Sequence, residues 1–237
     1  MKKHLLALIF WTACLLVTKA DEASPILTYP PLQQISADVF QLGSVRLDKK
    51  NKTIQFPAQL NMTNGLIEYL LVTTTGKTHE SLLKTEVEPY QIHLAMLLLG
   101  AKGATITPEE QTAPAAPFHA NQPGVRRPAI GGDPFTVQLT WKTDAEKAIP
   151  AEFCINNLTS KTNITSGPWH YNGSRVVKGA FLAQGEGSIV AMVDDLDAMA
   201  NNPRPNHDND QIWEINTNHL PPWKTPITVT FKLETKK

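Results

Sequence analysis

The chain has 237 residues, with 22 basic and 22 acidic side chains and a formal net charge of zero at pH 7. A chain of this length can bury one sizeable core or two small ones. The balanced charge gives no basic surplus for binding nucleic acid or anionic lipid, so we expect no nucleic-acid partner.

Residues 1–20 have the pattern of a secretory signal peptide. A basic start precedes the apolar stretch 5–17, and Ala20 stands just before the expected cleavage point. This stretch is too short for a permanent anchor, and no later one approaches ~20 apolar residues, so we expect no transmembrane segment. Lipid attachment at Cys14 is the less favoured alternative, because the apolar run continues past it. We predict an exported protein, periplasmic or extracellular.

Cleavage after residue 20 would remove three lysines and no acidic residue, leaving 19 basic and 22 acidic side chains and a net charge of −3. Only Cys154 would remain. A single cysteine excludes an intrachain disulfide, a four-cysteine zinc site and a cysteine-ligated iron–sulfur cluster. We expect Cys154 to be a buried, unreactive residue, since a free cysteine behaves as a small hydrophobe.

Residues 21–44 include three prolines and predict an extended leader, followed by one globular domain over residues 45–235. Strand alternation starts at 45–47 and 53–56, on either side of a polar turn, which indicates a hairpin. The run 66–73 is rich in strand-forming residues and predicts a further strand.

One helix is predicted near residues 89–99. Pro89 suits the first helical turn, and Gly100 suits a position just past the last one. The residues between them, including Leu97 and Leu98, leave almost no polar face. A helix that is apolar nearly all round is expected to be buried against the sheet.

Residues 104–134 contain six prolines and show neither helical nor strand period, so they predict a long Pro/Ala-rich surface loop. Strand patterns then resume at 135–141, 151–155, 169–171, 180–183, 188–193, 211–215 and 227–233. Many strands with one buried helix predict an α+β domain dominated by antiparallel sheet. A sandwich-like and a single-layer arrangement both stay open.

The densest candidate site is the segment 76–81, which contains His79, Glu80 and Ser81. If His93 on the helix folded back over it, two imidazoles and a carboxylate would form a zinc shell with an open position. The spacing matches no known zinc motif, so we favour a structural His79. Ser81 lies two residues from His79 but lacks the surroundings of a nucleophile elbow.

Two acidic segments offer further oxygen ligands. Asp194 belongs to the run 194–197, which could supply a carboxylate to the zinc site. Asn206, Asp208 and Asp210 alternate as in the first half of a calcium loop, but glycine and glutamate are missing from the sixth and twelfth positions. Solvated turns explain these acids as well. We therefore expect no cofactor, with zinc and calcium as the alternatives.

Tryptophans provide the candidate binding residues. Trp169, Trp213 and Trp223 could line a carbohydrate-binding surface if they were exposed. Tryptophans in strands are more often part of the core, which is the favoured interpretation.

Six segments together are similar to the bacterial YdjY-like family: 76–81, 92–101, 169–174, 183–191, 201–205 and 210–213. The resemblance covers Val45 to Leu233 and implies an exported bacterial protein, but it supplies no reaction. Members are sometimes labelled ferredoxin-like, which a single mature cysteine contradicts.

These observations favour an envelope protein that acts as a non-catalytic binding or assembly module, with another envelope protein or a glycan as its partner. The first alternative is a metal-dependent, hydrolase-like enzyme centred on His79 and His93. The second is a carbohydrate-binding surface.

Overall fold

The computed structural model describes residues 30–112, 131–142 and 146–234. The predicted signal peptide with Cys14, residues 21–29 of the predicted leader and the middle of the predicted Pro/Ala-rich loop lie outside the described residues.

The secondary structure is mostly β. In chain order the strands are β1 Leu32–Gln34, β2 Val39–Leu42, β3 Val45–Asp48, β4 Thr53–Leu60, β5 Tyr69–Thr73, β6 Ser81–Thr85, β7 Asp133–Lys142, β8 Glu146–Pro150, β9 Ile155–Asn157, β10 Thr162–Asn163, β11 Trp169–Tyr171, β12 Val176–Val177, β13 Ala180–Phe181, β14 Ser188–Ala191, β15 Ala200–Asn201, β16 Trp213–Ile215 and β17 Pro226–Leu233. The α-helices are α1 Pro89–Leu98, α2 Pro108–Thr112 and α3 Leu182–Glu186, and the 3-10 helices are η1 Thr78–Glu80, η2 Ala151–Cys154 and η3 Thr217–His219.

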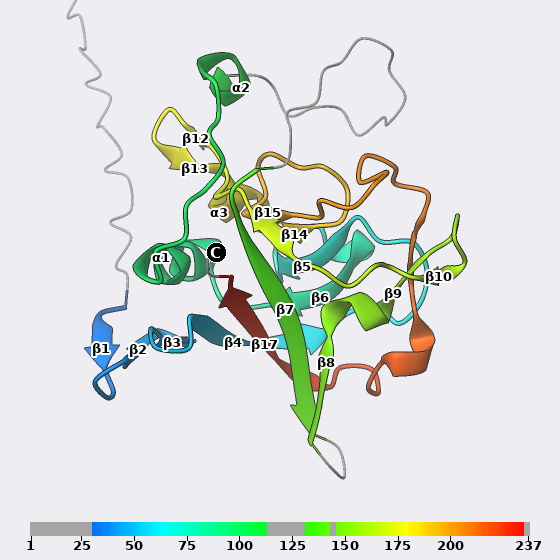
Figure 1. Ribbon diagram of the computed structural model, residues 1–237, viewed down its shortest axis with the longest axis horizontal. Coiled ribbons are helices and arrows are strands. Elements are labelled where there is room, and N and C mark those ends of the chain that lie inside the picture. Colours follow the sequence, from blue (N-terminus) through cyan, green and yellow to red (C-terminus); the bar gives the residue numbers. More distant parts are fainter. Residues whose placement is uncertain (1–29, 113–130, 143–145, 235–237) are drawn as a thin grey trace, which may run out of the picture.

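Eight strands form a closed barrel (Figure 1), in the order β4, β17, β7, β11, β15, β14, β5 and β6. The ring closes where β6 pairs with β4, at Gln59↔Lys84 and Leu60↔Leu83. The expected α+β domain with a sandwich-like or single-layer sheet is therefore wrong, because this long-range pairing folds the sheet onto itself. Closure leaves no free hydrogen-bonding edge within the ring.

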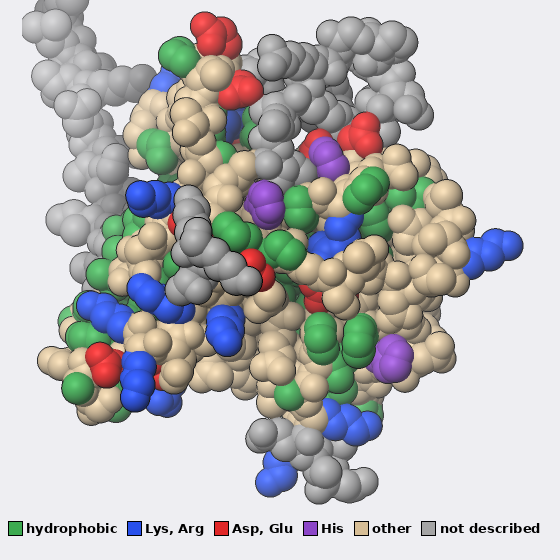
Figure 2. Space-filling view, viewed as in Figure 1, with side chains coloured by type: hydrophobic (Ala, Val, Ile, Leu, Met, Phe, Trp, Pro, Cys, Tyr) green, Lys and Arg blue, Asp and Glu red, His purple; other side chains and the backbone are tan. Residues whose placement is uncertain are grey.

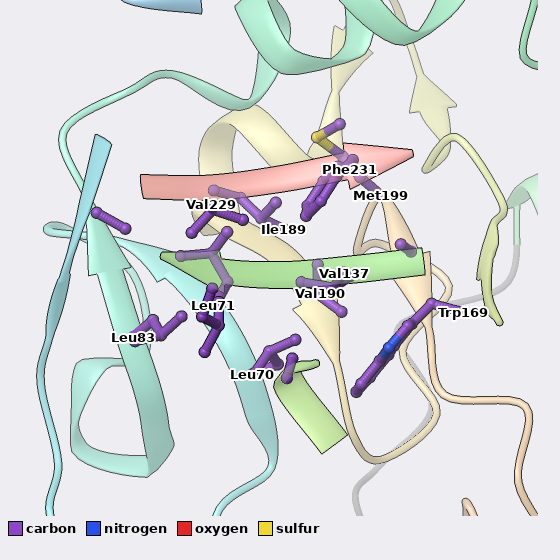
Figure 3. Packing of buried hydrophobic residues seen from close by; sticks show 14 of the residues in the cluster. Leu70, Leu71, Leu83, Val137, Trp169, Ile189, Val190, Met199, Val229 and Phe231 are labelled. Atoms are coloured by element: carbon purple, nitrogen blue, oxygen red, sulfur yellow. The ribbon is translucent and has the colours of Figure 1, made fainter. Parts of the chain in front are cut away.

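Side chains of the long strands fill the barrel. Buried and more exposed residues alternate along β4, β17 and β7, as the sequence pattern predicts. Phe231 packs between Phe56 and Phe135, with ring centroids 5.2 and 4.8 Å apart. Figure 3 shows Val137 and Val229 beside Phe231 in this cluster. The barrel interior is thus a packed core. A functional site is therefore expected on the outer surface of the barrel or in its loops.

Helix α1 has the predicted position but is not buried on all sides. Ile92, Ala95 and Met96 are buried, and the helix lies against β3, β4 and α3. The side chain of Leu97 points outward with 47% of its surface exposed. The expectation of a fully buried helix is therefore wrong, because one covered face is enough to place it on the barrel.

Shorter elements extend the barrel. β1, β2 and β3 continue the sheet outward from β4, so the predicted leader contains two sheet strands. β8 pairs with β7, while β10, β9 and β16 form a separate three-stranded sheet and β12 and β13 a two-stranded one. The described part of the predicted loop contains α2 and the start of β7.

Across residues 30–112, 131–142 and 146–234, the helices are all too short or too polar to span a membrane.

Candidate functional site

Four half-buried carboxylates gather on the outer side of β5 and β14, and we call Glu68, Glu80, Asp195 and Asp210 the acidic patch. Glu68 directly precedes β5, and Glu80 ends η1. The backbone N–H of Glu68 donates to the carbonyl of Glu80 at 2.9 Å, and its own carbonyl accepts from Met192 at 2.7 Å. These bonds hold the start of β5 between η1 and the end of β14.

Tyr69 forms the floor of the acidic patch. Its side chain is fully buried in a small apolar cluster with Val72, Ala191 and Ala198, outside the main core. The Tyr69 hydroxyl donates to Asp195 Oδ2 at 2.8 Å. Burial and the Asp195 carboxylate both raise the pKa of Tyr69, so the phenol stays protonated and keeps this donor role.

Lys77 is the cation of the site. Its Nζ donates to the Tyr69 hydroxyl at 2.7 Å and lies 4.9 Å from the centre of the Tyr69 ring. An ammonium in this position gains a hydrogen bond and a cation–π interaction together. The acidic patch therefore already has the chemistry that accommodates a positively charged nitrogen.

Two glycines position the loop that carries Lys77. Gly187 has a φ of +69°, and a Cβ added to it would lie 2.9 Å from the Cα of Gly76. A Cβ on Gly76 would in turn lie 3.0 Å from the carbonyl oxygen of Gly187. Side chains at these two positions would push the loop away from β14, so the close approach requires glycine.

Among the described carboxyl groups, Glu68 has the largest shift in pKa. Burial, with the charges of Glu80, Asp210 and Asp195, raises its pKa to about 7, and Lys77 only partly offsets this. The group therefore exchanges a proton near neutral pH. The pKa of Glu68 is raised because several carboxylates lie close together in a half-buried site.

A hydrogen-bonded asparagine pair holds the loop of Asp195. The Asp195 N–H donates to Asn201 Oδ1 at 2.9 Å, and Asn201 Nδ2 donates to the Asp195 carbonyl and to Asn172 Oδ1, both at 2.8 Å. Asp197 adds a backbone bond to Asp195 Oδ1 and accepts from Arg175 Nε at 2.6 Å. Asp195 is thus presented by a fixed loop.

Ser188 lies beneath the same site. It pairs with Val72 and shares the face of Tyr69, whose pKa it influences. Its side chain is fully buried, and its Oγ has no hydrogen-bond partner of good geometry among the described residues. Ser188 therefore adds a buried hydroxyl next to the Tyr69 phenol.

The family model described as YdjY domain matches residues 45–232. The chain belongs to the YdjY domain family. Neither a curated protein nor a solved structure matches the chain.

The YdjY domain match runs from the start of β3 to Lys232 in β17 and leaves β1 and β2 outside it. Two residues of the acidic patch, and several that surround it, come from segments that carried the resemblance. Lys77 and Glu80 come from 76–81 and Asp210 from 210–213, while Gly187, Asn172 and Asn201 come from three others. These segments are distant in the sequence, and the barrel brings them together.

The structure places His79 and His93 in different surroundings. The side chain of His79 is 79% exposed and approaches Glu80 at 3.5 Å. His93 Nδ1 shares a 2.7 Å hydrogen bond with the Tyr171 hydroxyl, and its ring lies 4.7 Å from that of Phe181. Burial lowers the pKa of His93. In the part of the YdjY domain that the structure describes, no group of three or more His, Cys, Asp or Glu residues could hold a metal ion.

Some of the other predicted ligand residues form hydrogen bonds within the fold, and others belong to the acidic patch. Ser81 is fully buried and donates to the carbonyl of Leu83 at 2.8 Å. Asp194 Oδ1 hydrogen-bonds the ring of His207. Asp208 is half-buried in the turn before β16, and Asp210 belongs to the acidic patch. Glu80 and Asp210 are thus the two predicted residues that belong to the acidic patch.

Of the three candidate tryptophans, two are buried in the core and one is exposed. Trp169 is fully buried and donates from Nε1 to Glu152 at 3.1 Å, and Trp213 is 1% exposed. Trp223 is 62% exposed and donates from Nε1 to the carbonyl of Asn61 at 3.2 Å. Cys154 is fully buried, and burial raises the pKa of its thiol to about 12, as expected of an unreactive residue.

Asp195 belongs to the predicted acidic run 194–197, and Lys77 lies in the candidate segment 76–81 without a predicted role. Glu68 and Tyr69 were not predicted as site residues. The available signal was Glu68, a charged residue within an otherwise apolar strand run. The charged residues that act on Glu68 range from Lys77 to Asp210 along the chain. A local sequence pattern cannot predict contacts between residues that are so far apart in the sequence.

Proposed function

We propose that this YdjY-domain protein is an exported bacterial envelope protein and a non-catalytic binding module. The acidic patch would be its docking surface for a positively charged group of a partner protein. The observation that carries the proposal is the charge imbalance at Glu68. The charges acting most strongly on it are three carboxylates and a single ammonium, that of Lys77.

The physical argument is neutralisation. Half-buried carboxylates repel one another because water screens them incompletely. An incoming ammonium or guanidinium group would relieve this repulsion and form charge-assisted hydrogen bonds, which are roughly twice as strong as neutral ones. The hydrogen bond from Lys77 Nζ to the Tyr69 hydroxyl is a charge-assisted contact of this kind within the protein itself. A lysine or arginine side chain of a partner is therefore the ligand that fits this chemistry.

The export part of the proposal rests on residues 1–20. Their basic start, apolar stretch and terminal Ala20 have the pattern of a cleavable signal. The intact mass of the exported protein tests it, and we expect a chain that begins at Asp21. A mass that corresponds to a lipid-bearing chain beginning at Cys14 would contradict simple cleavage before Asp21.

Binding is tested by titrating the mature protein with a pentalysine peptide in low salt, using calorimetry. We expect saturable binding that weakens as salt rises, because the attraction is electrostatic. The double substitution Glu68→Gln and Glu80→Gln should weaken binding at least about tenfold, which corresponds to ~1.4 kcal/mol. Glu86→Gln is the matched control, since Glu86 is exposed and lies outside the patch.

Two results would overturn the proposal. The first is binding that is equal in the double variant and in wild type, which would place the peptide elsewhere. The second is a rise in melting temperature with zinc or calcium that Glu68→Gln abolishes, because ligand linkage would then identify a metal as the ligand. We expect a chelator to leave the melting temperature of the purified protein unchanged.

A further inference from the structure

The outer face of three long neighbouring barrel strands forms a polar surface. Every second side chain along β4 and β7 points away from the core, and β17 follows the same alternation, although its Thr230 is largely covered, with 8% of its surface exposed. We call nine polar residues at these outward positions the polar track: Thr53, Gln55, Gln59, Thr136, Gln138, Thr140, Thr228, Thr230 and Lys232. Pro57, Pro134, Lys142 and Pro226 occupy the other outward positions of the three strands. Hydroxyl and amide groups therefore dominate this face.

The strand register arranges these side chains in rows. Gln55, Thr230 and Gln138 lie opposite one another across the three strands, and Gln55 Nε2 donates to Thr230 Oγ1 at 3.3 Å. Thr228 and Thr140 form the next row. Neighbouring strands lie about 4.8 Å apart, and the eight residues of β17 span roughly 26 Å. The track is long enough for several units of a linear polymer.

An exposed tryptophan stands at one end of the polar track, just before β17. Besides its bond to Asn61, the ring of Trp223 has Lys224 Nζ 4.2 Å from its centre. Gln59 Nε2 donates to the carbonyl of Lys224 at 3.2 Å, which ties this loop to β4. A large aromatic ring held in place and left in solvent is a typical platform for stacking against a ligand.

A cavity of about 250 Å³ lies at the other end of β17. It is lined by Lys52, Leu99, Gly100, Lys102, Asp133, Leu233 and Glu234. Lys52 Nζ donates to the carbonyl of Leu99 at 2.8 Å, and Asp133 accepts the N–H of Lys102 at 2.9 Å. The track therefore runs from an aromatic platform to a hollow with cationic side chains.

The charges of this side are mainly positive. Figure 2 shows Lys and Arg side chains gathered over β2, β3, β4 and β17. On and beside the track these are Arg46, Lys52, Lys102, Lys224 and Lys232, against Asp48, Asp133 and Glu234. Two of the acids already accept hydrogen bonds, Asp48 from Asn51 and Asp133 from Lys102. A partner with spaced negative charges would complement this face.

We propose that the polar track binds an anionic polysaccharide, which lies along β17 between Trp223 and the cavity. A sugar ring would stack on Trp223, its hydroxyls would exchange hydrogen bonds with the Thr and Gln rows, and its carboxylates would pair with Lys232 and Arg46. This inference does not rest on the acidic patch. β17 and β14 occupy opposite positions in the ring of eight strands, so the two surfaces are separate.

The test is calorimetric titration of the mature protein with a polygalacturonate oligomer, followed also by tryptophan fluorescence. We expect saturable binding with a change in fluorescence. Trp223→Ala should weaken binding at least about fivefold, and Lys232→Gln about threefold, because they remove the stacking and the charge contact. Thr228→Glu, which places a negative charge in the middle of the track, should nearly abolish binding. Lys161→Gln is the matched control, since Lys161 is an exposed lysine between β9 and β10.

Each other outcome overturns the proposal. Absence of binding to polygalacturonate, or binding that none of the three track variants weakens, would exclude the polysaccharide from this face. If an uncharged dextran bound as tightly as polygalacturonate, the proposal that the ligand must be anionic would be wrong. Tighter binding of a thymidine oligonucleotide would identify a nucleic acid instead. Unchanged circular dichroism and melting temperature ensure that each variant is folded, and the pentalysine titration reports separately on the acidic patch.

Discussion

Arg204 and Glu152 form a buried ion pair, with Arg204 Nη2 2.9 Å from Glu152 Oε1. The same carboxylate oxygen accepts the Trp169 Nε1–H, and the guanidinium lies 4.9 Å from the centre of the Trp169 ring. Further bonds join Arg204 to Asn202, Thr165 and Gly167. One arginine thus connects η2, β11 and the loop after β15.

Removing one member of this pair should be costly. We expect Glu152→Ala to destabilise the domain by about 3–5 kcal/mol, since it leaves a buried guanidinium without its counter-charge. Urea unfolding measures the loss. The double substitution Glu152→Met and Arg204→Met should recover much of it, because both charges are then absent. A loss below ~1 kcal/mol for Glu152→Ala would contradict a desolvated pair.

The acidic patch predicts a pH-dependent stability. The raised pKa of Glu68, about 7 against an ordinary value of 4.5, means that the folded state binds more protons than the unfolded state between these values. Its contribution is therefore complete below pH 4.5 and is lost as pH rises through about 7. Glu80, Asp210 and Asp195 are the carboxylates responsible.

We expect Glu68→Gln to melt at a higher temperature than wild type at pH 8, and the difference to disappear at pH 4.5. Scanning calorimetry across this range measures it. Glu86→Gln should show no such trend. A Glu68→Gln variant that is less stable than wild type at pH 8 would mean that the carboxylate has a favourable partner.

Helix α1 offers a matched pair of neighbours. Met96 is fully buried and Leu97 is 47% exposed. We expect Met96→Ala to cost about 2–5 kcal/mol through the cavity it leaves. Leu97→Ala should stay within about 0.5 kcal/mol, as is usual at the surface. Equal costs in chemical denaturation would show that Leu97 is covered in solution.

Glycine at position 187 should be essential for the loop of Lys77. Gly187→Ala places a Cβ against Thr73 and the backbone of Gly76, at a φ of +69°. We expect a loss of roughly 1–3 kcal/mol and weaker pentalysine binding. Gly185→Ala is the control, since a Cβ at Gly185 would meet no atom within 4 Å. Equal stability of the two variants would contradict the close approach of the loops.

The two histidines should behave differently. His79 is largely exposed, so His79→Ala should change the unfolding free energy by less than about 0.5 kcal/mol. His93→Ala removes a half-buried ring and its bond to Tyr171, so a loss above ~1 kcal/mol is expected. Added zinc should leave the melting temperature of wild type unchanged. A zinc-dependent rise that either substitution abolishes would instead support the metal-dependent enzyme.

Local pattern was enough to predict several elements. The alternation at 53–56, 135–141 and 227–233 predicted β4, β7 and β17, because a strand with one face on a core must alternate. Pro89 and Gly100 similarly bracketed α1, since their backbone preferences act within one helical turn. The six resembling segments were enough to recognise the family that the match over residues 45–232 confirms.

The closure of the barrel and the composition of the acidic patch depended on tertiary structure. Gln59 pairs with Lys84, and Glu68 faces carboxylates as far along the chain as Asp210. A strand's own sequence specifies which of its faces is apolar but not which distant strand completes its hydrogen bonds. The sequence therefore determined the strands, the family and the residues available for chemistry. Long-range strand pairing decided which of those residues meet, because only packing brings groups so far apart in the chain within a few ångströms.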